Sequence, residues 1–331
     1  MLDQVGSKSK NKSDRAQINN LRHIIAFVGP TASGKSELGI QVALEIGGEI
    51  INCDSVQVYE EIQVATAKVP VNERRGIPHH LIDFVSPAIN FTAADWARTA
   101  TQRIQEIEAR GKAAMIVGGT GLYLRALRAP FFPSPPTDEE LRSRLTSIRE
   151  QHGPEHIHKI LARFDPDEAT KLNARDWPRV QRAIEFRLQT RERISAQRPL
   201  REQPPDFSDR IRVFALNPPR EELYARINAR TEQHFANGLV DEVRKLLAAG
   251  VPANSNALGA HGYRRVVEFL RGERDLDSAI DQTKLDVRHY AKRQLTWFRR
   301  EPGVDWIDGF GDNPETQQAV LSRLRTHAIA T

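Results

Sequence analysis

One octapeptide has both the residue types and the spacing of a phosphate-binding loop. Gly29-Pro30-Thr31-Ala32-Ser33-Gly34-Lys35-Ser36 fits the pattern G-x-x-x-x-G-K-[ST] without deviation. Glycines let backbone N–H groups converge on phosphate oxygens, and the N-terminus of a following helix adds partial positive charge. Lys35 supplies a mobile cation, and the Ser36 hydroxyl can hold a magnesium ion. The octapeptide predicts phosphate binding but does not identify the phosphate.

The elements that must position this loop are indicated by short apolar runs and helical spacing. A buried strand is expected at Leu21–Val28 before the loop and a helix at Glu37–Ile46 after it. Further strands are expected at Gly48–Asn52 and Ala113–Val117, with a helix at Ala93–Arg110 between them. Alternating strands and helices are typical of a parallel sheet with helices on both faces. The sequence predicts an α/β fold with a P-loop NTPase-like parallel sheet core.

Two proline-bearing stretches interrupt this pattern. Ala129–Pro136 contains four prolines in eight residues, and a second break runs from Pro199 to Pro205. The sequence between them shows only helical patterning, and a strand is expected again at Ile211–Leu216. We therefore predict three parts: a disordered tail at 1–20, an α/β core at 21–137 and 204–331, and an all-helical insertion at 138–203.

The acidic residues near the loop do not favour an ATPase. A nucleoside-triphosphate hydrolase normally has an aspartate after a neighbouring strand, where it helps to hold magnesium. Here Ala113–Val117 ends in Gly118-Gly119-Thr120, and the earlier strand ends in Asp54. The loop could instead bind a diphosphate that departs as a leaving group.

Four stretches together resemble one enzyme family, the tRNA dimethylallyltransferases. They are GPTASGKS at Gly29–Ser36, DSVQVY at Asp54–Tyr59 with Thr66-Ala67-Lys68, GGTGLY at Gly118–Tyr123, and YAKRQLTWFR at Tyr290–Arg299. Their order and spacing agree with the family from about residue 22 to residue 308. The resemblance implies transfer of a dimethylallyl group from dimethylallyl diphosphate to N6 of adenine 37, next to the tRNA anticodon. It also implies that pyrophosphate is released and that Mg²⁺ is the cofactor.

The same resemblance assigns roles to single residues. It implies that Asp54 is the general base and that Thr31 and Thr120 lie near the reacting groups. It implies further that Lys35 and Arg230 act on the diphosphate, with Mg²⁺ at Ser36. From the residue types alone, Asp54 would also suit a helix N-cap or a magnesium ligand. Arg230 alone would suit a solvated helix face.

Basic residues concentrate in the predicted insertion. From Lys171 to Arg201 nine basic and three acidic residues give a balance of +6, more than the +5 of the whole chain. Read alone, this pattern suits a solvated helix face as well as a phosphate backbone. The resemblance implies contact with the anticodon stem-loop of tRNA. The residues implied at the tRNA are Asp54, Ser55, Val56, Gln57, Thr120, Arg142, Pro178, Arg179, Val180, Gln181, Arg182, Gly259, Ala260, His261, Gly262, Tyr263 and Arg264.

Three positions depart from the family pattern. Glu61 stands where a glycine is usual after the tyrosine, and Ala65 stands where a glycine usually precedes Thr66. Val69 separates Lys68 from Pro70, whereas the family usually has the proline directly after the lysine. These departures leave the geometry of the loop and the role of Lys68 open.

Composition excludes several classes of protein. Hydrophobic residues make up 39% and charged residues 27% of the 331 residues, which excludes wholesale disorder. No apolar run is long enough for a membrane span, and no secretory signal is present, so a cytoplasmic protein is expected. Cys53 is the single cysteine, so an internal disulfide is excluded. Nothing in the sequence calls for more than a monomer.

Two other functions share the phosphate loop. A small-molecule kinase would consume ATP with a small acceptor, and by pattern alone the loop is ATP-binding. A non-catalytic RNA-binding protein would use the loop as a nucleotide switch.

The histidines at 152, 156 and 158 lack zinc-site spacing and have no neighbouring cysteine, so a zinc site is disfavoured.

Overall fold

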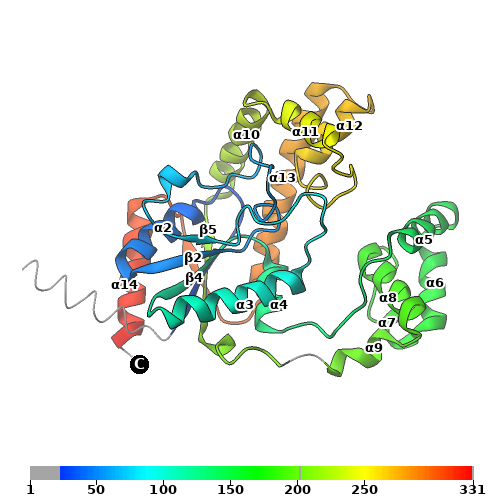
Figure 1. Ribbon diagram of the computed structural model, residues 1–331, viewed down its shortest axis with the longest axis horizontal. Coiled ribbons are helices and arrows are strands. Elements are labelled where there is room, and N and C mark those ends of the chain that lie inside the picture. Colours follow the sequence, from blue (N-terminus) through cyan, green and yellow to red (C-terminus); the bar gives the residue numbers. More distant parts are fainter. Residues whose placement is uncertain (1–22, 201–202, 330–331) are drawn as a thin grey trace, which may run out of the picture. The chain divides into compact units, whose positions relative to one another are not determined.

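The computed structural model describes residues 23–200 and 203–329, with side chains up to Arg325 (Figure 1). The predicted tail at 1–20 lies outside the described residues. The chain divides into two compact units. We name residues 1–128 and 205–331 the core unit and residues 129–204 the helical unit. No helix among the described residues is long and apolar enough to cross a membrane.

A parallel sheet forms the centre of the core unit. Within the described residues it has six strands in the order β3-β2-β4-β1-β5-β6, and each neighbouring pair is parallel. The strands are β1 (Ile24–Val28), β2 (Gly48–Asn52), β3 (His79–His80), β4 (Ala113–Val117), β5 (Ile211–Asn217) and β6 (Val304–Asp308). The predicted strands are present, and β2 and β4 have the predicted bounds. The short β3 and the polar-alternating β6 were not predicted.

Helices cover both faces of this sheet. α2 (Lys35–Ile46) and α14 (Pro314–Ile329) lie on one face, and α3 (Ala93–Ala109) and α4 (Gly121–Arg128) lie on the other (Figure 1). The prediction of a P-loop-type α/β fold is therefore confirmed. α3 begins with a capping box in which Thr92 and Asp95 bond each other's backbone N–H, which is why the helix starts at the predicted residue.

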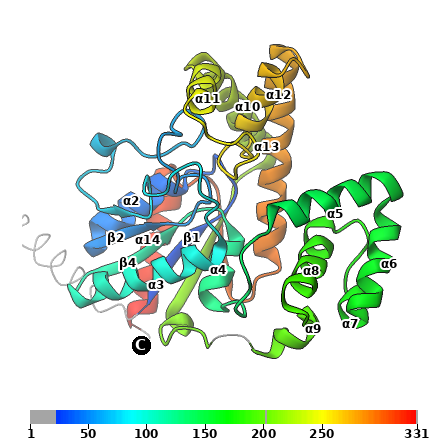
Figure 2. The ribbon, with the colours of Figure 1, turned by 45° about the vertical axis from the view of Figure 1, so that its right-hand side comes forward.

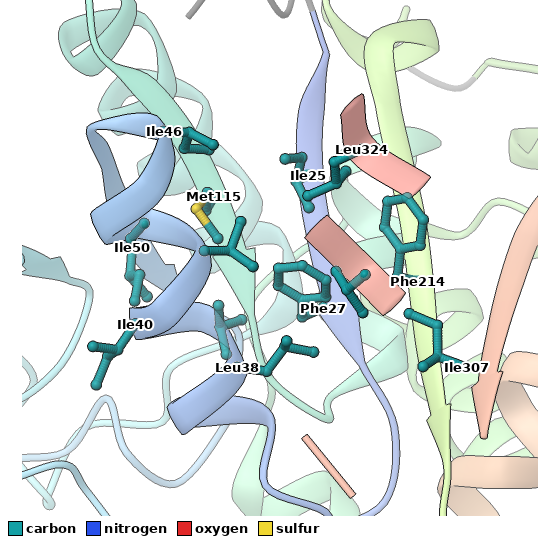
Figure 3. Close-up of a cluster of buried hydrophobic side chains, with 14 of the residues drawn as sticks. Ile25, Phe27, Leu38, Ile40, Ile46, Ile50, Met115, Phe214, Ile307 and Leu324 are labelled. Carbon is teal, nitrogen blue, oxygen red and sulfur yellow. The ribbon is translucent and has the colours of Figure 1, made fainter. Parts of the chain in front are cut away.

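The main hydrophobic cluster fills the space between the sheet and α2 and α14. Alternate strand residues such as Ile25, Phe27 and Phe214 point into it and meet Leu38 and Leu324 from the helices (Figure 3). This alternation follows from the two-residue period of a strand, which sends successive side chains to opposite faces. Because these side chains are almost completely buried, the cluster fixes the start of α2 relative to β1.

Further helices complete the core unit around the long α13. They are η1 (Val71–Glu73), η3 (Ser208–Arg210), α10 (Arg220–Ala236), α11 (Leu239–Ala248), α12 (Tyr263–Leu270) and α13 (Leu276–Arg299). α13 packs against α10 and α12 along its length and against α4 near its end (Figure 2). α13 therefore connects α4, which covers the sheet, with α10 and α12, which follow β5 in the chain.

The helical unit has its own hydrophobic core. It comprises α5 (Glu139–His152), α6 (Pro154–Phe164), α7 (Pro166–Ala169), α8 (Trp177–Thr190), α9 (Ile194–Gln197) and η2 (Arg198–Leu200). Ile157, Leu161 and Ile184 are completely buried at its centre. The unit also includes the proline-rich stretch that was assigned to the core, because the Phe132 ring packs edge-on against Phe186 at 5.7 Å.

The segment after β2 is held by polar contacts. The buried Lys68 ammonium donates to the carbonyls of Tyr59 at 2.6 Å and Ile62 at 2.7 Å, and it pairs with Asp83. Burial lowers the pKa of Lys68, and the Asp83 carboxylate opposes that shift. Lys68 therefore joins the loop at Tyr59 and Ile62 to the segment that follows β3.

The residues that depart from the family pattern differ in the strain of their backbone. Glu61 has φ of 61°, in the left-handed region that favours glycine. Ala65 has no positive φ, and its N–H donates to the Tyr263 hydroxyl at 3.2 Å. Of these two departures only Glu61 is strained, and Ala67 of the same loop also has a positive φ, of 51°.

Replacing Glu61 with glycine should relieve this strain. E61G is expected to stabilise the core unit by about 1 kcal/mol, because a left-handed L-residue costs about that much. The melting temperature measured by calorimetry should rise by about 2 °C. The matched control is E60G at the neighbouring exposed position, where φ is not positive and glycine should lower the melting temperature. A melting temperature for E61G below that of the unsubstituted protein would contradict this account.

Candidate active site

The phosphate loop connects β1 to α2 in the conformation that its glycines allow. Gly29, Ala32 and Gly34 have φ of 137°, 63° and 82°. At Gly34 a Cβ atom would lie 2.6 Å from the backbone nitrogen of Asp312, so no larger residue fits there. The loop is thus shaped from one side by its own backbone and from the other by the segment after β6.

Lys35 is the first residue of α2, and its ammonium group lies among other charges. The Nζ atom donates to the Pro30 carbonyl at 2.5 Å. Burial lowers the pKa of Lys35 to about 8, the Asp54 carboxylate raises it and the Arg230 guanidinium lowers it further. The structure therefore brings three of the predicted catalytic residues within electrostatic reach of one another.

Asp54 follows β2 in a turn that fixes its carboxylate. The Oδ1 atom accepts hydrogen bonds from the backbone N–H groups of Val56 at 2.9 Å and Gln57 at 3.3 Å. This is an Asx turn and not the cap of a helix. The Oδ2 atom accepts no hydrogen bond from the residues that the structure describes. One carboxylate oxygen is thus anchored and the other remains available as a base.

The turn after β4 packs directly on the turn after β2. A Cβ atom at Gly118 would lie 2.1 Å from the Cys53 carbonyl oxygen, so only glycine allows this approach. The Thr120 N–H donates to the same carbonyl at 3.1 Å, and the Thr120 Oγ1 atom accepts from the Ser55 N–H at 3.0 Å. Thr120 is therefore locked beside Asp54.

A residue of α13 connects this turn to the phosphate loop. The Gln294 Oε1 atom accepts from the Thr31 N–H at 2.8 Å, and its Nε2 atom donates to the Gly119 carbonyl at 2.9 Å. Gln294 is 5% exposed. It lies within the Tyr290–Arg299 motif but was not predicted as a site residue, because a glutamine in a basic helix gives no signal of what it bonds.

Thr31, Asp54 and Thr120 line one cavity of about 590 Å³ in the core unit, and Lys35 and Gln294 are not among its lining residues. Further lining comes from α10, from the loop before α12 and from α13. The predicted site residues that line it are Thr31, Ala32, Asp54, Ser55, Val56, Thr120, Arg230, Gly259, Ala260, His261 and Gly262. The other loop residues, Gly29, Pro30, Ser33, Gly34, Lys35 and Ser36, are not part of the lining.

His234 and Tyr290 are among the aromatic lining residues that the sequence prediction missed. His234 lies one turn of α10 beyond Arg230, and burial together with that guanidinium lowers the pKa of His234 to about 4. Its imidazole is therefore neutral at pH 7. Tyr290 of α13 lies beside His261, with ring centroids 4.9 Å apart, and burial raises the pKa of its hydroxyl. A histidine and a tyrosine at helical spacing look like ordinary surface or core residues in the sequence.

Other predicted tRNA-contact residues of the core unit lie outside the cavity lining. The Gln57 side-chain amide donates to the Thr66 carbonyl at 2.9 Å. The buried Tyr263 hydroxyl donates to the Glu242 carboxylate at 2.6 Å. Arg264 is 65% exposed and pairs with Glu268. Gln57 and Tyr263 therefore shape the rim of the site through their hydrogen bonds.

The predicted tRNA-contact residues of the helical unit divide into two groups. Arg142 and Arg182 both pair with the completely buried Glu185, at 3.2 and 2.9 Å. Val180 is buried in the core of the unit, and the Gln181 amide donates to the Arg142 carbonyl. In contrast, Pro178 and Arg179 are exposed at the start of α8.

Lys35 predicts a pH dependence of anion binding. Because its pKa is about 8, Lys35 is charged at pH 7 and loses its proton above pH 8. Affinity for inorganic pyrophosphate, measured by calorimetry from pH 7 to 9.5, should therefore fall by up to about tenfold per pH unit above pH 8. K35R keeps its charge, so its affinity should change only through the titration of pyrophosphate itself. Parallel pH curves for the two proteins would contradict the assignment.

Comparisons with known proteins identify the family. The pattern of the IPP transferase family matches residues 57–301. The tRNA dimethylallyltransferase of Solibacter usitatus is 45% identical over 91% of this chain and 97% of its own length. That of Geobacter metallireducens is 43% identical over 86% of this chain and 92% of its own.

Solved structures agree with this result. The tRNA isopentenylpyrophosphate transferase of Bacillus halodurans is 33% identical and superposes with a TM-score of 0.68, covering 93% of this chain and 98% of its own. A eukaryotic dimethylallyltransferase acting on tRNA is 28% identical with a TM-score of 0.72, covering 93% of this chain and 78% of its own. With the phosphate loop, the Asp54 turn and the Thr120 turn gathered at one cavity, the chain belongs to the IPP transferase family.

Proposed function

We propose that this chain transfers a dimethylallyl group from dimethylallyl diphosphate to N6 of adenine 37 in tRNA and releases pyrophosphate. The relatives are named tRNA dimethylallyltransferases, which are prenyltransferases that act on tRNA. The observation that carries the proposal is the closeness of a phosphate loop and a carboxylate, Asp54, whose charge acts on Lys35. A phosphate site and a base at one cavity suit a transfer that expels a diphosphate.

The donor side of the cavity suits a leaving diphosphate. Backbone N–H groups of the loop and the ammonium of Lys35 surround the place where phosphate oxygens bind. Arg230 lines the cavity and has no salt-bridge partner among the described residues. Its guanidinium is therefore available for the negative charge that develops as the C1–O bond breaks. Apolar side chains of Ile227, Leu239 and Val287 line the same cavity and suit the prenyl group.

The acceptor side must activate a weak nucleophile. The lone pair of an adenine amino group is delocalised into the ring, so removing a proton from N6 helps the attack on C1. The Oδ2 atom of Asp54 takes that proton while the new N–C bond forms, and the C1–O electron pair leaves with pyrophosphate. Thr120, fixed beside Asp54, faces the same space. Adenine must leave its stack to enter this cavity, so base flipping is expected.

Magnesium fits the donor set of the loop. Ser36 offers a hydroxyl oxygen on the first turn of α2, and Mg²⁺ prefers one or two protein oxygens together with phosphate oxygens. No cluster of three or more acidic, histidine or cysteine side chains among the described residues could hold a metal. We therefore propose Ser36 as the protein ligand, with the diphosphate as the main one. When bound, the ion would neutralise charge on the leaving group.

We propose further that the chain acts as a monomer with the helical unit on the anticodon stem. One chain supplies the whole lining of the cavity, so a second copy is not needed for the site. Arg179 and Pro178 are exposed on α8 and can meet a phosphate backbone. Arg142 and Arg182 support this surface by pairing with Glu185 and also keep part of their guanidinium exposed.

The direct test is incubation with dimethylallyl diphosphate, Mg²⁺ and unmodified tRNA that carries adenine after the anticodon. Digestion and mass spectrometry should show adenosine heavier by one isopentenyl group. The same mixture with ATP in place of dimethylallyl diphosphate should give no phosphorylated product. ATP-dependent phosphorylation of a small acceptor without prenylated tRNA would instead support the kinase.

The Asp54 assignment predicts a loss confined to the chemical step. D54N keeps the size of the side chain but cannot accept the N6 proton, so kcat should fall by about 10²- to 10⁴-fold. Single-turnover assays on bound tRNA measure this step directly. Binding of tRNA and of pyrophosphate, measured on the same variant, should stay within about threefold. Near-normal turnover by D54N would contradict the assignment of Asp54 as the general base.

Arg179 provides a test of the tRNA surface. R179A should weaken tRNA binding and reduce the slope of log affinity against log salt by about 1, the effect of one lost phosphate contact. Arg144, which is 71% exposed on α5 and pairs with Glu140, is the control, and R144A should leave the slope unchanged. Filter binding from low to moderate salt checks both variants. Equal slopes for R179A and the unsubstituted protein would place the tRNA elsewhere.

A further inference from the structure

Two loops carry the two halves of the proposed reaction, and they belong to different strands. The phosphate loop follows β1 and presents Thr31 to the cavity. The acceptor side consists of the Asp54 turn after β2 and the Thr120 turn after β4, and the Thr120–Ser55 hydrogen bond joins these two turns. The distance between the donor loop and this pair of turns decides whether C1 and N6 can meet.

Gln294 spans this distance with a single side chain. Its Oε1 atom holds the Thr31 N–H on the donor side, and its Nε2 atom holds the Gly119 carbonyl next to Thr120 on the acceptor side. The contacts are close, since a Cβ atom at Gly119 would lie 2.1 Å from the Gln294 Nε2 atom. The side chain does not line the cavity itself.

The helix that carries Gln294 adds a second contact to the same turn. Tyr290 lies one turn earlier on α13 and lines the cavity, with its hydroxyl near the Thr120 side chain. α13 therefore holds the Thr120 turn through Tyr290 and Gln294 and the phosphate loop through Gln294 alone. Among natural side chains, glutamine supplies one acceptor and one donor at the end of an uncharged stem of this length.

We propose that Gln294 is a positioning residue that sets the spacing between the diphosphate-binding loop and the adenine-activating turns. This inference rests on the proposed function. Without Gln294, the Thr31 N–H and the Gly119 carbonyl would each lose a partner in a buried place, and both loops would relax. A misplacement of about 1 Å is enough to slow a reaction by about 10²-fold.

The first variant is Q294M, which keeps the length of the side chain and removes both hydrogen bonds. Its kcat for tRNA prenylation should fall by about 10- to 100-fold, while KM for dimethylallyl diphosphate and for tRNA should change by less than about threefold. Assays run well below the melting temperature of each variant separate this effect from unfolding. The matched control is Q282M, which makes the same substitution on the same helix. The Gln282 amide donates to Asp286 and not to either loop, so kcat should stay within about twofold.

The second variant, Q294E, tests the donor bond separately. A neutral carboxylic acid can donate to the Gly119 carbonyl and accept from Thr31, as glutamine does, whereas a carboxylate can only accept. The kcat of Q294E relative to the unsubstituted protein should therefore rise as pH falls from 8.5 to 6, and the ratio for Q294M should stay flat. A role in stability alone would not give this difference in pH profile.

The outcomes separate the inference from the proposed function. If the unsubstituted protein forms no isopentenyladenosine, the proposed function is wrong, whatever the variants show. If it does, a kcat of Q294M within twofold of the unsubstituted protein overturns the positioning role. A loss that appears in KM alone, or a flat pH ratio for Q294E, overturns it as well. A reduced kcat for Q294M together with acid recovery of Q294E supports it.

Discussion

The adjacency of β2, β4 and β1 is the constraint on which the site depends. Carboxyl ends of neighbouring parallel strands meet at one edge of a sheet, so the loops that follow these strands converge. The phosphate loop, the Asp54 turn and the Thr120 turn each come from one of these ends. Close packing at Gly118 and Gly34 then removes the remaining freedom of the loops. The opposing charges of Lys35 and Asp54 are brought together by this geometry before any ligand binds.

The sequence could predict those parts of the fold and of the site that depend on residues close to one another in the chain. Apolar runs predicted the strands around the phosphate loop, and the spacing of glycines predicted the loop itself. Both signals depend only on neighbouring residues. β6 was missed because its five residues include two aspartates and form no continuous apolar run, which was the signal used for the other strands. Gln294 was missed because its partners, Thr31 and Gly119, lie far away in the chain. His234 was missed because its position on a helix does not show that it lines the cavity. The strain at Glu61 depends on its backbone angle, which the sequence does not give.

The helical unit shows how a charge count differs from a charged surface. The stretch from Lys171 to Arg201 is strongly basic, yet Arg182 is partly neutralised by Glu185 and Arg198 by the buried Glu168. A buried carboxylate needs such partners, and removing one of them would destabilise the unit. Arg179 is more exposed, although it also pairs with Asp176 at 3.3 Å. The net charge of the segment therefore overstates the positive charge that its surface presents.

The contact between Gly34 and the segment around Asp312 also has a consequence for biosynthesis. The backbone N–H of Gly311 donates to the Ser33 carbonyl at 2.8 Å, so residues that follow β6 support the phosphate loop. During synthesis the loop emerges from the ribosome long before these residues do. The loop is therefore expected to reach its final conformation only after the segment at Gly311 has been made and has folded against it.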